Sequence, residues 1–219
     1  MADLKKGKTV WIARHGNRAD FVDRSWPMTA ARPHDPPLSA DGNVQAQLLG
    51  KRMKGQPVRH LFASPFLRTM ETASHVAEHL DLPIKLEHGA GEYLNPDWFK
   101  RAPDFLSHDE IRSRFPRVDL TYTSRGVSKY PEHDEQTHCW PRAGKTVRKL
   151  VEDFDGDLMI VCHGATMLGL SYGLVENYLP IHCGLTCLVK IVWNGEKWVL
   201  ELNGCAEHLA TSTQPKSPR

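Results

Sequence analysis

The sequence has almost no excess charge of either sign. Its 28 Lys and Arg residues stand against 26 Asp and Glu residues, which leaves a formal net charge of +2 over 219 residues. So small an excess argues against nucleic acid or an anionic membrane as the main partner. The sequence also lacks an apolar run long enough to span a bilayer, and its first residues lack the apolar segment of a signal peptide. We therefore expect a cytoplasmic protein that binds neither nucleic acid nor membrane.

Cysteine is scarce and does not occur in metal-binding spacings. The five cysteines are an odd number and form no C-x-x-C pair, which is typical of reduced thiols rather than of a disulfide framework. Two groups of histidine and cysteine, within residues 133–139 and 182–187, lack the spacing of a zinc site. We expect no metal and no cofactor.

The composition, with 40% apolar and 25% charged residues, is that of an ordinary globular protein. The length fits one large domain or two small ones. No linker interrupts the pattern of elements, so we expect a single domain over residues 1–209. Residues 210–219 are mostly Thr, Ser, Pro and Lys, and a disordered tail is predicted there.

Strands and helices alternate along the chain. Short apolar runs predict strands at residues 9–13, 58–63, 84–86 and 158–162, with helices between and after them. Two later runs, 185–193 and 198–202, predict a β-hairpin with a type I′ turn at Asn194-Gly195. This alternation predicts an α/β protein with three layers, α/β/α, and a mostly parallel central sheet. Ligands of such sheets bind at the carboxyl ends of the strands.

Two helix starts carry capping signals. Ser39 is the predicted N-cap of a helix that runs to about Met53, and the predicted buried face of that helix is formed by Val44, Leu48 and Leu49. Ser64 is the predicted N-cap of the next helix, with Pro65 in its first position.

An apolar strand followed by His-Gly occurs twice. His15 and Gly16 follow the first strand, and His163 and Gly164 follow the strand at 158–162. If both strands belong to one parallel sheet, both imidazoles lie at its ligand-binding edge. A glycine after each histidine lets the backbone approach a ligand closely. The repeated context favours a functional histidine pair over two unrelated structural histidines.

Three arginines indicate what the histidine pair binds. Arg14 and Arg18 flank His15, and Arg68 lies in the first turn of the helix that leaves the second strand. Guanidinium groups repel a metal dication and bind phosphate through paired hydrogen bonds. A neutral imidazole beside a bound phosphoryl group is a competent nucleophile, and phosphoryl transfer then needs mainly positioning and charge stabilisation. A carboxylic acid should lie nearby to protonate the leaving oxygen.

These motifs resemble the histidine phosphatase superfamily, which also contains the phosphoglycerate mutases. The similar segments are Arg14 to Arg18, Pro37 to Ala46, Ser64 to Ala73 and Val161 to Gly164, in the family's order, within a likeness that covers residues 9 to 200. Residues 14–21 look closest to the phosphatase domains of the suppressor of T-cell signalling proteins and the ecdysteroid-phosphate phosphatases. The resemblance implies a phosphoglycerate mutase-like fold whose insertions, about 19–37 and 93–140, cap the site.

The resemblance also implies roles for individual residues. His15 would be the nucleophile that forms a phosphohistidine, and Glu92 would be the proton donor. The phosphate pocket would be formed by Arg14, Asn17, Arg18, Arg68, His163 and Gly164. Three other carboxylates compete with Glu92 for the donor role: Asp20, Asp35 and Glu71. Of these, Glu71 is expected to be a helix-surface charge.

The expected function is therefore hydrolysis of a phosphate monoester without a metal. Two alternatives remain open, a phosphoglycerate mutase-like phosphotransferase and a non-catalytic binder of a phosphorylated ligand. The mutase is less favoured because Arg18 stands where mutases usually carry Ser, and no Trp-Asn pair follows. We expect a small-molecule or aryl phosphate ester as substrate, phosphotyrosine-like esters included, and a homodimer is compatible with the sequence. Eight aromatics of the capping segments are candidates for an apolar vestibule: Phe21, Trp26, Tyr93, Trp98, Phe99, Phe105, Tyr122 and Trp140.

Overall fold

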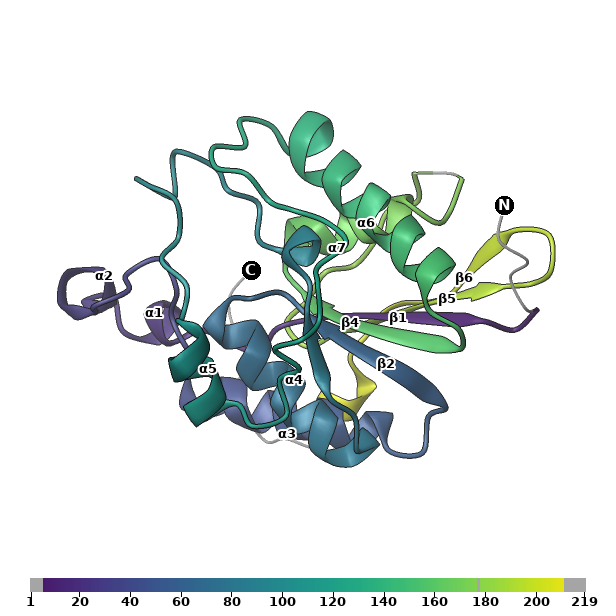
Figure 1. Cartoon of the computed structure of the whole chain (residues 1–219), viewed down its shortest axis with the longest axis horizontal. Coiled ribbons are helices and arrows are strands. Elements are labelled where there is room, and N and C mark those ends of the chain that lie inside the picture. The colour runs from purple at the N-terminus through teal and green to yellow at the C-terminus, as the bar shows by residue number, and fades with distance from the viewer. Residues whose placement is uncertain (1–5, 177, 211–219) are drawn as a thin grey trace.

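A six-stranded sheet lies between two layers of helices in the computed structural model, which describes residues 6–176 and 178–210 (Figure 1). The strand order is β3-β2-β4-β1-β5-β6. The bounds are β1 Thr9–Arg14, β2 Val58–Ala63, β3 Ile84–Leu86, β4 Asp157–Cys162, β5 Leu188–Trp193 and β6 Trp198–Cys205. The first four strands run parallel, whereas β5 and β6 are antiparallel to their neighbours. The predicted strands and the mostly parallel sheet are confirmed.

Helices cover both faces of the sheet. The pair α3 (Ala40–Met53) and α4 (Leu67–Leu80) covers one face, and the pair α6 (Trp140–Asp153) and α7 (Gly164–Tyr172) covers the other (Figure 1). Shorter helices lie in the connecting segments: α1 Ala19–Val22, α2 Trp26–Thr29, α5 His108–Arg114, the 3₁₀ turns η1 His88–Ala90 and η3 Glu207–Leu209, and the π-turn η2 Glu135–Cys139. Within the described residues, none of the helices is long and apolar enough to cross a membrane.

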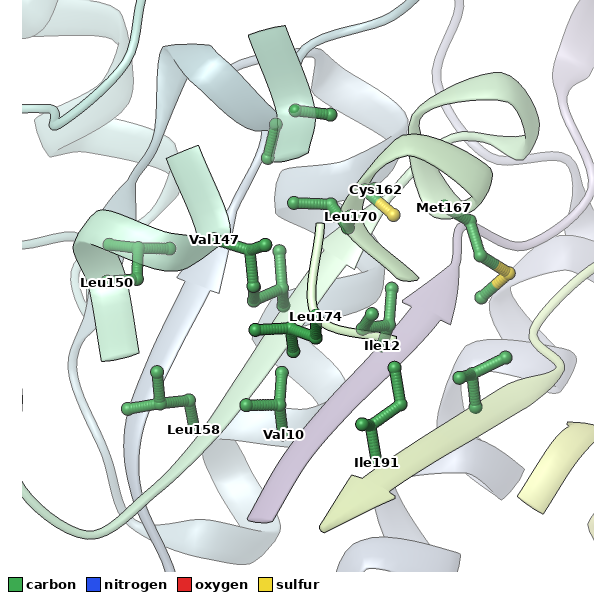
Figure 2. Packing of buried hydrophobic residues seen from close by; sticks show 14 of the residues in the cluster. Val10, Ile12, Val147, Leu150, Leu158, Cys162, Met167, Leu170, Leu174 and Ile191 are labelled. Carbon is green, nitrogen blue, oxygen red and sulfur yellow. The ribbon is translucent and has the colours of Figure 1, made fainter. Parts of the chain in front are cut away.

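The core is divided by the sheet, because successive side chains of a strand point to opposite faces. On β1, Val10 and Ile12 pack toward α6 and α7 with Leu150 and Leu170, as Figure 2 shows. Trp11 and Ala13, which alternate with these residues along β1, pack toward α3 and α4. A central strand that is buried on both faces reads as a continuous apolar run, which is why it could be identified in the sequence.

The buried face of α3 differs from the prediction. Leu49 is buried as predicted, whereas Val44 is 39% exposed. The other buried residues of the helix are Gly42, Ala46, Gly50 and Met53. A Cβ atom at Gly50 would lie 2.5 Å from the carbonyl oxygen of His75 on α4. The two helices therefore meet through small residues, and close backbone contact rather than side-chain size decides which face is buried.

The start of α4 also differs from the prediction. The helix begins at Leu67, and Ser64 is not its N-cap. The Leu67 N–H instead donates to the Asp35 carboxylate at 2.8 Å, so a carboxylate from the segment before α3 caps the helix. Ser64 is left free to point its hydroxyl elsewhere.

The hairpin of β5 and β6 is confirmed, but its type I′ turn is wrong. The strands end at the pair Trp193–Trp198, which leaves a four-residue connection. Gly195 has φ +103°, whereas among the described non-glycine residues only Asp81 and Thr186 have positive φ, so Asn194 cannot occupy a type I′ position. The Asn194 side-chain oxygen accepts from the N–H groups of Glu196 and Lys197, which stabilises the longer loop. Of the predicted tail, residues 211–219 lie outside the described residues.

Candidate active site

The parallel pairing of β1 with β4 brings the two predicted histidines together. Arg14 pairs with Cys162 in the register, so His15 and His163 are the next residues on adjacent strands. The His15 N–H donates to the Cys162 carbonyl at 3.0 Å, and the imidazole centroids lie 5.3 Å apart. The expected edge of the sheet is therefore the place where the candidate residues meet.

His15 is buried and neutral, with a defined tautomer. Its Nδ1 lies 2.7 Å from the Gly16 carbonyl oxygen, which can only accept, so Nδ1 carries the proton and Nε2 keeps its lone pair. Burial lowers the pKa of His15 well below its ordinary value, and Arg68, His163 and Arg14 lower it further. The imidazole thus presents an unprotonated nitrogen at neutral pH.

His163 is completely buried and held on both ring nitrogens. Nε2 lies 2.8 Å from the Ser64 hydroxyl, while Nδ1 faces Arg68 Nη2 and Glu92 Oε2, each at 3.2 Å. Burial lowers the pKa of His163 to about 4, against an opposing effect of Glu92. The ring also packs edge-on against Phe66, with centroids 5.0 Å apart.

Arg68 is the buried cation of the site, with 1% of its side chain exposed. It lies over the ring of Phe66, 4.5 Å from the centroid. Its Nη2 is 3.1 Å from Glu92, and its Nη1 is 3.8 Å from Asp35. Burial lowers the pKa of Arg68 to about 10, and the neighbouring Arg18 adds to this lowering. Nε and Nη1 have no hydrogen-bond acceptor within the described part of the chain, which leaves two buried nitrogens that can donate to an anion.

Glu92 lies inside this cluster. Its carboxylate is 12% exposed and contacts Arg68 at 3.1 Å and His163 at 3.2 Å. Burial favours the protonated form, but the facing His163 and Arg68 outweigh it and hold the pKa of Glu92 well below its ordinary value. The carboxylate is therefore ionised in the free site.

The other two arginines lie nearer the rim. Arg14 donates through Nη1 to the Cys183 carbonyl at 2.7 Å, while its buried Nε has no acceptor among the described residues. Arg18 is held by both oxygens of Asp20 and lies over the Phe21 ring, 4.4 Å from its centroid. Asp20 thus fixes the Arg18 guanidinium at the base of α1, close enough to Arg68 to lower its pKa.

Asn17 and the two glycines differ from one another in what surrounds them. The Asn17 side chain donates to Asp41 at 2.8 Å and accepts from the Arg18 N–H, so it links the site to the start of α3. A Cβ at Gly16 would lie 2.5 Å from the Gly42 carbonyl oxygen, so this glycine is needed for packing against α3 rather than for approach to a ligand. Gly164 opens α7, and a Cβ there would meet only the Arg14 guanidinium, at 3.5 Å.

Of the competing carboxylates, Asp35 lies closest to the cluster. It is buried, caps α4 and faces Arg68. Asp20 is held by Arg18. The prediction that Glu71 is a helix-surface charge is wrong: its side chain is 20% exposed and accepts from the Leu38 N–H at 2.6 Å, because the segment before α3 folds over α4.

Asp35 makes stability depend on pH in a distinctive way. Burial raises its pKa to about 6, although Arg68 and the Leu67 N–H oppose the rise. Between the ordinary Asp pKa and this value the folded state binds more protons than the unfolded state, so stability falls as pH rises through that window. We expect the stability of the wild type relative to Asp35→Asn to fall by about 2 kcal/mol between about pH 4.5 and 7.5, measured by urea unfolding. Replacement of the exposed Asp109 by Asn is the control. If the difference in free energy of unfolding between the wild type and Asp35→Asn were as independent of pH as that for Asp109→Asn, the raised pKa would not belong to Asp35.

The site also contains a set of donors of the kind that bind metals. Side-chain ligand atoms of His15, Glu92 and His163 lie within 4.8 Å of one another. A divalent ion between them would have to displace the Arg68 hydrogen bond from Glu92 and lie beside a buried guanidinium. The expectation that the site uses no metal stays a prediction.

The aromatics of the capping segments do not form one continuous surface. Tyr93 and Phe99 are buried, and Tyr122 packs on Phe62 within the core. Two aromatics are exposed, Phe21 at 53% and Trp98 at 59%. Each of the two contacts a candidate site residue or the chain neighbour of one. Phe21 stacks on Arg18, and Trp98 packs on Tyr93, which follows Glu92 in the chain. The vestibule therefore stays a prediction, reduced to these two accessible rings.

Two residues of the cluster were not anticipated in their positions. Ser64 follows β2 directly, as the histidines follow β1 and β4, and its N–H donates to the Val161 carbonyl. The strand-end rule that identified the histidines would also have identified Ser64. Phe66, two residues further on, contacts both His163 and Arg68.

A parallel sheet with a histidine at the end of each of two adjacent central strands, beside one buried and two partly buried arginines, defines an α/β protein with a cluster of histidines and arginines at its strand ends. Residues 10–205 match the Histidine phosphatase superfamily (branch 1), and the chain belongs to that superfamily. The predicted fold class, including its likeness to phosphoglycerate mutases, is confirmed. Proteins named as phosphatases and as probable phosphoglycerate mutases are among its relatives.

Two curated relatives and one solved structure are similar to the chain over most of its length. The chain is 31% identical to the ecdysteroid-phosphate phosphatase of Bombyx mori over 95% of this chain and 38% of that protein. It is 27% identical to the transcription factor tau 55 kDa subunit of Saccharomyces cerevisiae, over 94% of this chain and 57% of that one. The crystal structure of the Bombyx mori ecdysone phosphate phosphatase with tungstate superposes with a TM-score of 0.76 at 24% identity, covering 97% of both chains. The chain thus spans little more than half of the length of the yeast relative and less than half of the length of the Bombyx mori relative.

Proposed function

We propose that the protein is a phosphomonoesterase that works through a phosphohistidine intermediate, with His15 as the nucleophile. The observation that carries the proposal is the state of His15, which is buried, unprotonated and faced by cationic groups. The unpartnered N–H groups of Arg68 and Arg14 supply the donors that a phosphoryl group requires. A binder would need the arginines, but it would not need a neutral imidazole with a fixed tautomer.

The chemistry follows from the positions of these groups. Arg14 and Arg68 hold the phosphoryl oxygens, with Arg18 at the rim and the start of α7 at Gly164 as a further anion contact. His163 joins them through Nδ1 when the bound ester takes the place of Glu92 at that nitrogen. Asn17 keeps Arg18 and the residues after β1 in place through Asp41. Nε2 of His15 attacks phosphorus as the ester P–O bond breaks, and the leaving oxygen takes a proton from Glu92. Water then attacks phosphorus of the phosphohistidine and gives a proton to Glu92 as the P–N bond breaks, which restores His15. The inorganic phosphate takes that proton as it leaves, so Glu92 returns to the ionised carboxylate.

Glu92 must gain a proton before it can give one. The carboxylate is ionised in the free site because Arg68 and His163 face it. A bound phosphate monoester places negative charge beside Glu92 and takes over hydrogen bonds from Arg68, and both effects raise the pKa of the carboxyl group. Binding of the monoanionic form of the ester delivers the proton that Glu92 then transfers.

The substrate class that fits the rim is an aryl phosphate ester. Phe21 and Trp98 come from the two capping segments and are the accessible aromatics beside Arg18 and Tyr93. An aromatic leaving group can stack on such rings. In a panel of esters we expect aryl phosphates, phosphotyrosine included, to have higher kcat/KM than sugar phosphates, and the reverse order would argue against the vestibule.

Phosphate release from 4-nitrophenyl phosphate in excess EDTA tests the proposed chemistry. We expect the wild-type rate to be unchanged by EDTA, because arginines rather than a metal ion neutralise the phosphoryl charge. Loss of activity on chelation, with recovery on adding a divalent ion, would mean that His15, Glu92 and His163 hold a metal. If the protein released no phosphate, the mutase alternative would be tested by adding a phosphorylated primer, and the binder by calorimetry with inorganic phosphate.

A further inference from the structure

A second buried ion pair lies behind Glu92, outside the cluster described above. Arg142, at the start of α6, forms a bidentate ion pair with Glu132. Nε donates to Oε1 at 2.6 Å, and Nη2 donates to Oε2 at 2.9 Å. The two side chains are 9% and 5% exposed. Glu132 Oε2 also accepts from the Leu94 N–H at 3.0 Å, which ties the pair to the chain just after Glu92.

The remaining N–H groups of Arg142 hold the backbone on both sides of the Glu92 side chain. Nη1 donates to the Gly89 and Gly91 carbonyls at 2.9 and 3.1 Å, and Nη2 donates to the carbonyl of Glu92 itself at 3.1 Å. Thr166 on α7 adds a hydrogen bond to the Gly91 carbonyl at 2.6 Å. Four hydrogen bonds from two helices thus converge on three carbonyls of one short segment.

That segment has little regular structure of its own to hold it. The 3₁₀ turn η1 ends at Ala90, and the chain forms no helix or strand from there until α5. A carboxylate on such a segment would be free to move, yet Glu92 must stay within hydrogen-bond reach of the cluster to act on a leaving oxygen. Burying an ion pair is costly, and apolar side chains of similar size fill the same space at least as well.

We propose that Arg142, braced by Glu132, is a positioning residue that holds Glu92 in place for proton transfer. This inference rests on the proposed function, in which Glu92 protonates the leaving oxygen. Arg142 acts through the backbone of residues 89–92, and among the described residues it forms no hydrogen bond or ion pair with His15 or Arg68. Its loss should therefore weaken acid catalysis while the nucleophile and the phosphate-binding groups remain intact.

The dependence of rate on the leaving group separates positioning from a general structural role. Phenoxide has a conjugate-acid pKa of about 10 and needs a proton as it leaves, whereas 4-nitrophenoxide is stabilised by its nitro group and needs little help. The variant is Glu132→Gln with Arg142→Met, which removes both charges and keeps an acceptor for the Leu94 N–H. We expect its kcat/KM to fall roughly 10- to 100-fold with phenyl phosphate and less than about threefold with 4-nitrophenyl phosphate. Because kcat/KM reports the steps up to formation of the phosphohistidine, slow dephosphorylation cannot hide the difference.

Two further variants complete the test. Glu92→Gln should show the same selectivity more strongly. Arg117→Met, which removes an ion pair with Asp81 at the C-terminal end of α4, should affect both esters equally. If the double variant does not fold, Thr166→Val removes one of the four hydrogen bonds and should give a smaller loss of the same selective kind. If Glu92→Gln slowed phenyl phosphate selectively but the double variant slowed both esters equally, the positioning role of Arg142 would be overturned and the proposed function would stand. No phosphate release by the wild type would instead overturn the proposed function.

Discussion

Replacement of His15 by alanine is expected to lower the rate of phosphate release from 4-nitrophenyl phosphate at least roughly 10,000-fold, the scale seen when a catalytic nucleophile is removed. The reason is that no other group can take its place. The ring nitrogens of His163 are engaged by Ser64 on one side and by Arg68 and Glu92 on the other. The arginines would still bind the ester, so binding should survive while turnover is lost.

The measurement combines turnover with trapping of the intermediate. Wild-type protein that is quenched with base during hydrolysis of a ³²P-labelled ester should retain an acid-labile label, because phosphohistidine survives base and is hydrolysed by acid. His15→Ala should retain none. His60→Ala is the matched control, since His60 lies in β2 and contacts the Asp155 carbonyl. Label that remains on His15→Ala, or activity above about one hundredth of the wild type, would assign the nucleophile to another residue.

The arrangement of the strands could be predicted because a strand that is buried on both faces has a continuous apolar sequence. The central strands β1 and β4 are covered on both faces, so each is an unbroken apolar run that ends at the edge of the sheet. His15 and His163 stand at those ends, and parallel pairing alone is enough to bring them together. The same rule applies to Ser64 after β2, where the capping signal of a serine before a proline led to the wrong interpretation.

Other features depend on partners that local sequence does not name. Ser64 is not the N-cap of α4 because Asp35, from a segment far back in the chain, accepts the Leu67 N–H. Val44 points outward because the close contact of α3 with α4 is decided by Gly50 and the backbone opposite it. In each case the deciding contact joins two residues that are far apart in the sequence, and no local pattern of apolar residues predicts such a contact.

The supporting residues of the site are the least predictable part. Glu132 and Arg142 have no motif around them, and only the fold shows that both lie behind Glu92. The ionised state of Glu92 likewise depends on the facing His163 and Arg68, which outweigh the opposing effect of burial. A sequence resemblance can suggest that a carboxylate is the proton donor, but the way in which it gains its proton depends on this geometry.

Replacement of Arg68 by methionine is expected to lower kcat/KM with 4-nitrophenyl phosphate roughly 1,000-fold, as expected when a buried cation that stabilises the transferred phosphoryl group is lost. Arg68 is the only arginine of the three with its side chain almost fully buried, and its Nε and Nη1 point to no acceptor among the described residues. Methionine fills a similar volume and keeps the contact with Phe66. The loss should therefore report the missing charge and hydrogen bonds rather than a cavity.

The pH dependence of the same variant has a predictable sign. Arg68 lowers the pKa of both His15 and Glu92, so its removal raises both. A higher pKa for His15 means that the nucleophile becomes protonated at a higher pH, and the acidic limb of kcat/KM should move upward. Arg68→Lys restores a positive charge without the planar pair of donors, so we expect it to restore the pH profile but little of the rate. If lysine restored both, charge alone would explain the effect. If the acidic limb did not move in Arg68→Met, Arg68 would not be the group that keeps His15 unprotonated.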